Sequence, residues 1–147
     1  MTKIINKDFK ADVQLKAIEL LDNSLSLPAI PNVQITNFNI TIESKADAIN
    51  KFVFVIVSVE IKNDDQTLAL GSIRVSCIYY VTNFEEMIKT NKEGLTEINP
   101  ALLEIINSIS ISTTRGVMFS TFKGTFLHNA ILPLVDPKQI HVKHSTK

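Results

Sequence analysis

The sequence predicts an α+β fold, with a four-stranded antiparallel sheet and helices from the C-terminal third packed on one of its faces. Runs of alternating apolar residues fill the first two thirds, and the turns between them are too short for the crossovers of a parallel sheet. The last third begins a helix at Asn99-Pro100. We expect a single domain, residues 1–147, with flexible ends at residues 1–10 and 141–147.

The first two strands each contain a shift in the apolar pattern. In the first strand, which begins near Val13, the alternation changes phase between Ala17 and Ile18. In the second strand, residues 33–43, it changes phase near Asn37. One extra residue in a strand turns the following side chains to the opposite face, and a β-bulge absorbs that residue. Both shifts therefore predict bulges.

The third strand, residues 51–61, is apolar on both faces. Three large residues alternate with valines along it: Phe52, Phe54 and Ile56. A turn at residues 63–66 leads to the fourth strand, residues 67–82. An antiparallel sheet usually keeps one polar face in water. The sequence therefore predicts that helices cover one face and that a neighbouring subunit covers the other.

The helical third is predicted to hold two short helices. A polar loop at residues 89–94 precedes the first, which Asn99 caps with Pro100 at its first position. The alternation at residues 109–112 is typical of an extended segment, so we expect the helix to break there.

The second predicted helix is capped by Thr113 or Thr114 and runs to Phe122. The pair Lys123-Gly124 ends it, because glycine readily adopts the left-handed conformation of a helix C-terminus. The stretch that follows, residues 125–135, is apolar but irregular.

Composition excludes several kinds of partner. The 15 Lys and Arg residues balance 15 Asp and Glu residues, so a basic footprint for nucleic acid or membrane is missing. No apolar run is long enough to span a membrane. The single cysteine, Cys77, fits a reducing compartment, so we expect a cytoplasmic protein. Because no glycine-rich phosphate loop is present, we expect no cofactor.

The candidate chemical sites all have ordinary structural explanations. Cys77 and His128 could form a nucleophile and its base, but Cys77 fits an apolar strand position better. His141 and His144 have the spacing of metal ligands on a helix, without a third ligand nearby. Two acidic pairs lie in a turn and at a strand end, where solvated carboxylates are common: Asp64-Asp65 and Glu85-Glu86. The sequence therefore predicts neither an enzyme nor a metal site.

The second predicted helix and the segment after it are rich in large apolar side chains. Seven of them fall within sixteen positions: Phe119, Phe122, Phe126, Leu127, Ile131, Leu132 and Leu134. One short helix and one loop cannot bury all of these internally. We therefore expect about half of them to form a subunit interface or a surface for a binding partner.

The order of elements and one motif resemble the SecB family of protein-export chaperones. In that family the main helix carries an arginine near its start and ends in a basic residue followed by Gly-Thr-Phe, and a Leu/Ala-Pro step comes next. Arg115, Lys123-Gly124-Thr125-Phe126 and Leu132-Pro133 match this pattern. Gly116 stands where the family more often has an acidic residue, and the ten residues after Pro137 are too few for the family's last helix. The chain thus resembles a divergent, SecB-like member.

The resemblance implies a nucleotide-independent holdase, a homotetramer built as a dimer of dimers, that binds unfolded polypeptides in apolar surface grooves. We expect the groove to be lined by apolar residues of the C-terminal segment and the second strand: Phe126, Leu127, Ile131, Leu132, Leu134, Phe38, Ile40 and Ile42. We expect the oligomer interface to contain Met118, Phe119, Phe122, Val13 and Leu15.

Other functions are compatible with the sequence. The SecB family includes SecB-like chaperones that guard unstable antitoxins, so the chain could be a dedicated adaptor for one such partner. A role in protein export would instead add the translocase motor ATPase as a partner. A small-ligand-binding or enzymatic α+β domain is the third hypothesis, and it predicts a buried pocket with perturbed titratable groups.

Overall fold

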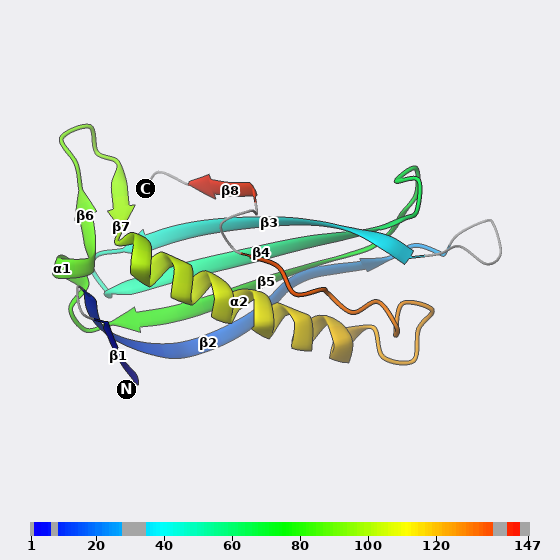
Figure 1. Cartoon of the computed structure of the whole chain (residues 1–147), viewed down its shortest axis with the longest axis horizontal. Helices are drawn as coiled ribbons and strands as arrows, with labels where there is room; N and C mark the ends of the chain where they lie inside the picture. Colours follow the sequence, from blue (N-terminus) through cyan, green and yellow to red (C-terminus); the bar gives the residue numbers. More distant parts are fainter. Residues whose placement is uncertain (1, 7–8, 28–34, 137–140, 145–147) are drawn as a thin grey trace.

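One antiparallel sheet with a single long helix across it makes up most of the structure (Figure 1). The computed structural model of the chain describes residues 2–6, 9–27, 35–136 and 141–144. Four long strands form the centre of the sheet in the order β2-β5-β4-β3, each antiparallel to its neighbour: β2 (Phe9–Leu25), β3 (Ile35–Asp47), β4 (Phe52–Asn63) and β5 (Ala69–Val81). The predicted fold class, a four-stranded antiparallel sheet with helical cover on one face, is confirmed.

Two short strands that the sequence did not predict extend the sheet at its edges. β1 (Thr2–Asn6) pairs antiparallel with the start of β2, and β8 (His141–His144) pairs parallel with β3. The β3–β8 pairing joins segments far apart in the sequence, whereas β1 pairs with residues close to it, Asn6 with Phe9 and Thr2 with Val13. These pairings do not test the flexibility expected for residues 1–10 and 141–147, which stays a prediction.

Both predicted bulges are present, but the first lies before Ala17 and not after it, so Ala17 pairs with Ile78 on the opposite face from Leu15. The register between β2 and β5 shifts between Leu15 and Ala17, and the register between β3 and β4 shifts between Ile35 and Asn37. A further shift follows Leu20. Through these shifts Leu15, Ile18 and Leu20 pair with Tyr79, Cys77 and Val75, which all face α2 (Pro100–Thr121). The bulges therefore keep the apolar residues of β2 on the helix side of the sheet.

The core lies between α2 and the two central strands, β4 and β5. Alternate residues of both strands are fully buried there: Val53, Val55, Val57, Val59, Ile61, Ile73, Val75, Cys77 and Tyr79. On the far face, the Phe52 ring packs edge-on against Phe54 and Tyr80, with 6.2 Å between centroids in each pair. The predicted division of β4 into a valine face and a phenylalanine face is correct. A neighbouring subunit over the far face stays a prediction.

The prediction of two short helices is wrong, because α2 is one continuous helix through residues 109–114. The hydroxyl groups of Ser110 and Thr114 donate hydrogen bonds to the carbonyl oxygens of Ile106 and Ser110, at 2.6 and 2.7 Å. These bonds satisfy polar side chains inside the helix, so the Ile-Ser alternation does not require an extended backbone. Thr114 is therefore an interior residue and not a cap.

A buried polar contact fastens α2 to the sheet. The hydroxyl oxygen of Tyr79 lies 2.8 Å from Ser110 Oγ and 3.2 Å from the carbonyl oxygen of Ile106. All three residues are fully buried. Because a buried hydroxyl without a partner is costly, this contact fixes the position of the helix along β5.

The ends of α2 follow the prediction. The side chain of Asn99 accepts hydrogen bonds from the N–H groups of Ala101 and Leu102, at 2.9 and 3.4 Å. The helix ends at Thr121, and Gly124 has a φ of +81°, the left-handed conformation expected of it.

A short hairpin stands where the sequence predicted only a polar loop. After the single turn α1 (Phe84–Met87), β6 (Ile88–Thr90) pairs with β7 (Thr96–Ile98). The Asn91 side chain accepts from the N–H groups of Glu93 and Leu95 and so closes the tip of the hairpin. The predicted loop at residues 89–94 is therefore correct only at its tip. Figure 1 shows the hairpin projecting from one end of the sheet.

Replacing Asn99 tests the helix cap. Asn99→Ala removes the acceptor for two N–H groups of α2 and should lower the free energy of unfolding by about 1 kcal/mol. Asn99→Asp should lose much less, because a carboxylate also accepts these bonds and suits a helix N-terminus. Urea unfolding at one fixed protein concentration measures both. Equal midpoints for the two variants would contradict the capping role.

Candidate functional site

The segment that follows α2 turns back and runs alongside it on the same face of the sheet (Figure 1). The turn is closed by Thr125, whose hydroxyl donates to the carbonyl oxygen of Phe122 at 2.7 Å and accepts from the N–H of Leu127 at 3.1 Å. We call residues 125–136 the return segment. It contains five of the eight residues predicted to bind clients.

Arg115 holds the return segment against α2. Its Nε donates to the carbonyl oxygen of Leu132 at 2.7 Å, and its Nη2 donates to that of Pro133 at 2.8 Å. Hydrogen bonds from a charged donor are stronger than those from a neutral one. Two parts of the motif that resembles the SecB family, Arg115 and the Leu132-Pro133 step, are thus in direct contact. The segment is irregular, as predicted, but it is tied in place.

The return segment alternates between buried and exposed side chains. Leu127, Ala130 and Leu132 are buried, whereas Ile131 is 57% exposed and Leu134 is 92% exposed. Leu127 packs directly on the backbone of β5, since a Cβ built on Gly71 would lie 2.6 Å from Leu127 Cδ1. The segment therefore contributes three apolar side chains to the core and presents Ile131 and Leu134 outward.

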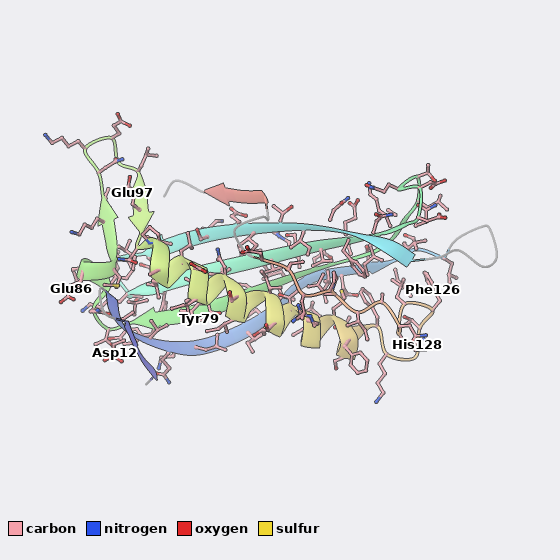
Figure 2. The ribbon with its side chains drawn as sticks, viewed as in Figure 1. Asp12, Tyr79, Glu86, Glu97, Phe126 and His128 are labelled. Atoms are coloured by element: carbon pink, nitrogen blue, oxygen red, sulfur yellow. The ribbon has the colours of Figure 1, made fainter. Side chains whose placement is uncertain are left out.

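The predicted client-binding residues divide in the same way. Leu127, Leu132 and Ile42 have almost no exposed surface, so they cannot contact a client in this conformation. Ile131 and Leu134 are exposed. The other three are half-buried at the border of the core: Phe126, Phe38 and Ile40. In Figure 2, Phe126 lies at the end of the molecule beyond the C-terminus of α2.

The predicted interface residues also divide. Met118, Phe122 and Val13 are buried within the chain, whereas Phe119 is 51% exposed and Leu15 is partly exposed. The buried members pack on the chain's own core. Only Phe119 and Leu15 present enough surface to meet another subunit.

A larger exposed surface, of which the sequence interpretation named only Leu15, lies on β2. Four leucine and isoleucine side chains on its helix side are 38–48% exposed: Leu15, Ile18, Leu20 and Leu25. β1 pairs with β2 only as far as Val13, so among the described strands the outer edge of β2 is unpaired from Gln14 onward. An apolar strand with an open edge readily pairs with another chain. We call this surface the β2 edge.

The outer side of α2 carries little charge and is rich in small residues. Only Glu104 and Arg115 are charged in the 22 residues of the helix. Small residues repeat at four-residue intervals on its exposed side: Ser108, Ser112, Gly116 and Ser120. A Cβ on Gly116 would meet no atom within 4 Å, so nothing within the described chain requires a glycine there. Ile109 and Phe119 flank this stripe with exposed apolar surface.

The structure gives no support to a nucleophile at Cys77. The side chain is fully buried, and burial raises the pKa of its thiol, so the thiolate is disfavoured. His128 lies beyond the end of α2 in Figure 2, with Nδ1 2.8 Å from the carbonyl oxygen of Thr125. Tyr79, which is two residues from Cys77 in the same strand, lies beneath the first half of the helix in the same view. Cys77 and His128 are therefore not placed as a nucleophile and its base.

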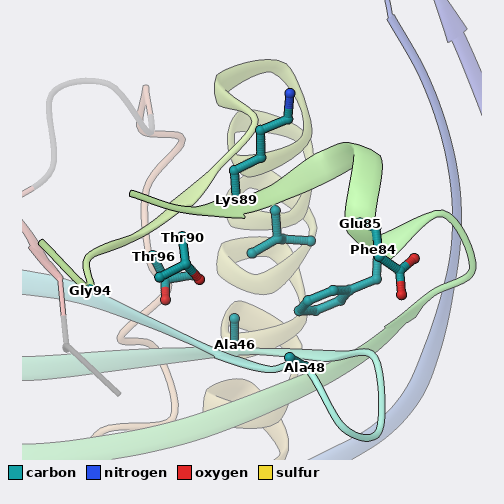
Figure 3. A pocket seen from close by; sticks show the side chains of 9 residues that line it. Ala46, Ala48, Phe84, Glu85, Lys89, Thr90, Gly94 and Thr96 are labelled. Carbon is teal, nitrogen blue, oxygen red and sulfur yellow. The ribbon is translucent and has the colours of Figure 1, made fainter. Parts of the chain in front are cut away.

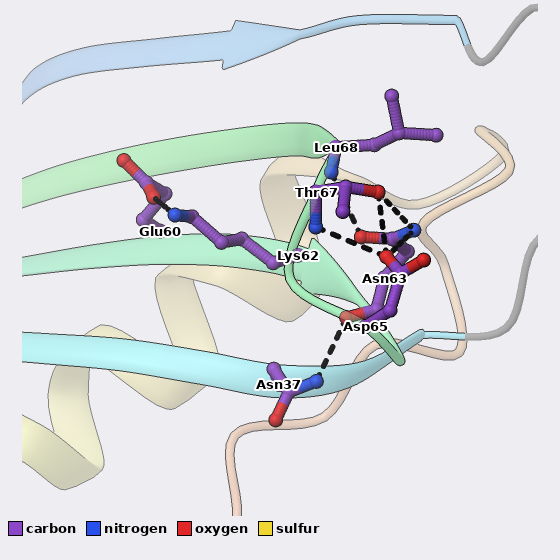
Figure 4. A network of polar contacts seen from close by, with 7 residues as sticks. All are labelled: Asn37, Glu60, Lys62, Asn63, Asp65, Thr67 and Leu68. Carbon is purple, nitrogen blue, oxygen red and sulfur yellow. Dashed lines mark hydrogen bonds and ion pairs between the residues drawn. The ribbon is translucent and has the colours of Figure 1, made fainter.

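The acidic pairs have structural roles or lie in solvent. Asp65 Oδ1 accepts hydrogen bonds from the Thr67 hydroxyl, the Thr67 N–H and the Asn63 amide, which hold the β4–β5 turn (Figure 4). These bonds, that of the Thr67 hydroxyl first, lower the pKa of Asp65. Glu85 and Glu86 are exposed on α1, and Glu85 lies 3.7 Å from Lys51 Nζ.

Within the ranges described above, no three His, Cys, Asp or Glu side chains come close enough to bind one metal ion. No helix in those ranges combines the length and apolar character needed to cross a membrane.

Among solved structures, the chain is similar to the SecB-like chaperone of Mycobacterium tuberculosis in complex with a ChAD peptide from the HigA1 antitoxin. The TM-score is 0.62, the alignment covers 84% of this chain and 89% of the other, and the sequence identity is 15%. The similarity confirms the predicted SecB-like fold. No family model matches the sequence, and no curated protein matches it.

Replacing Cys77 tests whether the thiol has any role beyond packing. Cys77→Ala should lower the free energy of unfolding by about 1 kcal/mol or less, because it removes a single heavy atom from the core. Binding of an unfolded test protein should not change. In the unchanged chain, Ellman's reagent should react with Cys77 only after denaturation. A folded Cys77→Ala chain without function would reopen the nucleophile hypothesis.

Proposed function

We propose that this chain is a SecB-like chaperone that holds unfolded polypeptides on the apolar surface of a homo-oligomer, without nucleotide. The observation that carries the proposal is the exposure of Ile131 and Leu134 beside α2 in a protein of SecB-like fold. Loop residues are usually polar, because their backbone stays near water. Large apolar side chains held at the surface by the contacts of Arg115 therefore favour the binding of apolar polypeptide.

The size of this surface is sufficient for useful affinity. Covering Leu134 would contribute roughly 1.5–3 kcal/mol, and covering Ile131, which is 57% exposed, would contribute about half as much. Since about 1.4 kcal/mol corresponds to a ten-fold change in affinity, two such contacts would matter to any client. A protein that binds the unfolded state and not the native state delays folding by mass action alone, so no ATP is needed.

The β2 edge supports self-association. Two copies of β2 related by a two-fold axis could pair along their outer edges and continue the sheet from one subunit into the next. The same pairing would cover the exposed side chains of Ile18 and Leu20. The outer side of α2, with its stripe of small residues and little charge, would then join two such dimers, because small residues let helices approach closely. The proposed assembly is a tetramer of about 66 kDa, four times the 16.4 kDa chain.

A dedicated chaperone for one partner is the second candidate. The SecB-like chaperone of Mycobacterium tuberculosis has been solved with an antitoxin peptide, which favours an antitoxin as the client over the many clients of an export chaperone. Affinity capture from the native cell extract separates the two. Many unrelated clients, together with the translocase motor ATPase, would indicate export, and one dominant partner would indicate a dedicated chaperone.

Charged residues on the β2 edge should disrupt the assembly. Ile18→Lys with Leu20→Lys places two cations in the proposed subunit contact, so the variant should sediment as smaller species at micromolar concentration. Glu19→Lys is the matched control, because Glu19 is on the opposite face of the same strand, paired with Ser76. Sedimentation equilibrium measures all three chains. A stable monomer for the unchanged chain would contradict the tetramer.

Polar residues in the return segment should abolish client binding. Ile131→Ser with Leu134→Ser should leave the melting temperature and oligomer size nearly unchanged, because both side chains are exposed. Suppression of the aggregation of reduced α-lactalbumin should be lost. Ile49→Ser, at the similarly exposed β3–β4 turn, is the matched control. Full protection by the double variant would show that this segment is not the client surface.

A further inference from the structure

The outer edge of β3 already carries a strand from the C-terminal end of the chain. His141–His144 of β8 pair in parallel with Thr41–Ser44. β3 has 13 residues, so β8 covers less than a third of it. Among the described strands, no other one pairs with this edge, which leaves residues 35–40 and 45–47 of β3 open.

This pairing is of a kind that another chain can replace. A parallel ladder is slightly less stable per residue than an antiparallel one. β8 is only four residues long. Short segments held by few hydrogen bonds open at low free energy. The β3 edge therefore accepts an extended strand but does not hold its present one strongly.

An open cavity of about 590 Å³ lies just past the end of this pairing, between the end of β3 and the β6–β7 hairpin (Figure 3). Its lining comes from β3 and its turn, from α1, and from the hairpin, and it includes Ala46, Ala48, Phe84, Glu85, Ile88 and Lys89. Phe84 and Ile88 are buried and form its apolar part, while Glu85 and Lys89 are exposed at its rim. The cavity suits an apolar side chain in a polypeptide.

The β3 edge and the cavity are connected through Ala46. This residue lies two positions after Ser44, where β8 pairing ends, and it lines the cavity. Paired residues of neighbouring strands direct their side chains to the same face of a sheet. A strand that follows the course of β8 for two more residues would therefore place a side chain beside Ala46, toward the cavity. Figure 1 shows β8 running along β3 toward the end that carries the hairpin.

We propose that the outer edge of β3 and this cavity bind an extended polypeptide strand by strand addition, and that β8 occupies part of the site until a client displaces it. The class of ligand rests on the proposed chaperone function. Backbone hydrogen bonds to β3 would provide affinity without regard to sequence, and the cavity would favour a client with a large apolar residue at one position. The tethered β8 competes at a high effective concentration, which lowers the apparent affinity for clients.

The test weakens β8 within the full chain. Val142→Pro with Lys143→Pro removes two consecutive N–H donors, one of which must face β3, because successive residues of a strand point to opposite edges. Ser145→Pro with Thr146→Pro, just after β8, is the matched control. The probe is a fluorescein-labelled peptide with the sequence of residues 137–147. It should bind the β8 variant about ten-fold more tightly than the unchanged chain or the control, since the fraction of open sites rises.

A second measurement tests the cavity. In the β8 variant, Ala48→Trp should fill the cavity and weaken binding of reduced α-lactalbumin at least three-fold. Ile49→Trp changes the next, equally exposed turn residue, which does not line the cavity, and should have no effect. Circular dichroism and melting curves verify that all variants are folded.

The outcomes separate the two proposals. Equal peptide binding by the β8 variant and its control, or no peptide binding by either, would overturn strand addition at β3, while α-lactalbumin binding would still support the chaperone function. Tighter peptide binding by the β8 variant, without binding of α-lactalbumin by any chain, would support the β3 site and overturn the general holdase function.

Discussion

The structure depends on the docking of α2 against β4 and β5, fastened where the hydroxyl of Tyr79 meets Ser110 and the carbonyl oxygen of Ile106. The position of the helix decides where Arg115 lies, and Arg115 decides where the return segment runs. The segment in turn places Leu127 on the backbone of β5 at Gly71. One buried polar contact thus governs which apolar side chains reach the core and which remain at the surface.

One helix is too narrow to cover four strands, and the exposed surfaces follow from that mismatch. A helix is about 10–12 Å wide with its side chains, while four strands spaced about 4.8 Å apart span roughly 14 Å between their outer axes. α2 covers β4 and β5, and the return segment adds Leu127 and Leu132 to the core. The apolar side chains on the helix side of β2 remain partly exposed. The apolar surface that α2 leaves uncovered accounts for the proposed self-association and for the proposed client surface.

The sequence predicted what local patterns determine. Alternation located the four strands, the phase shift before Ile18 located a bulge, and Asn99 located the helix start. The continuity of α2 was missed, because hydrogen bonds from Ser110 to the preceding turn are invisible in an apolar pattern. Burial in the return segment could not be predicted, since it has no periodicity and depends on contacts with Arg115 and Gly71. The pairing of β8 with β3 depends on backbone groups distant in sequence.

The chain has no tryptophan and two tyrosines, and these are neighbours in β5. Because successive strand residues point to opposite faces, Tyr79 lies under α2 while Tyr80 packs against Phe52 on the far face. The tyrosine part of the near-ultraviolet signal therefore has one source on each side of the sheet. The ring of Tyr79 responds optically to the docking of the helix, and the ring of Tyr80 responds to whatever approaches the open face. The two tyrosines of the unlabelled protein can therefore report separately on the two faces of the sheet.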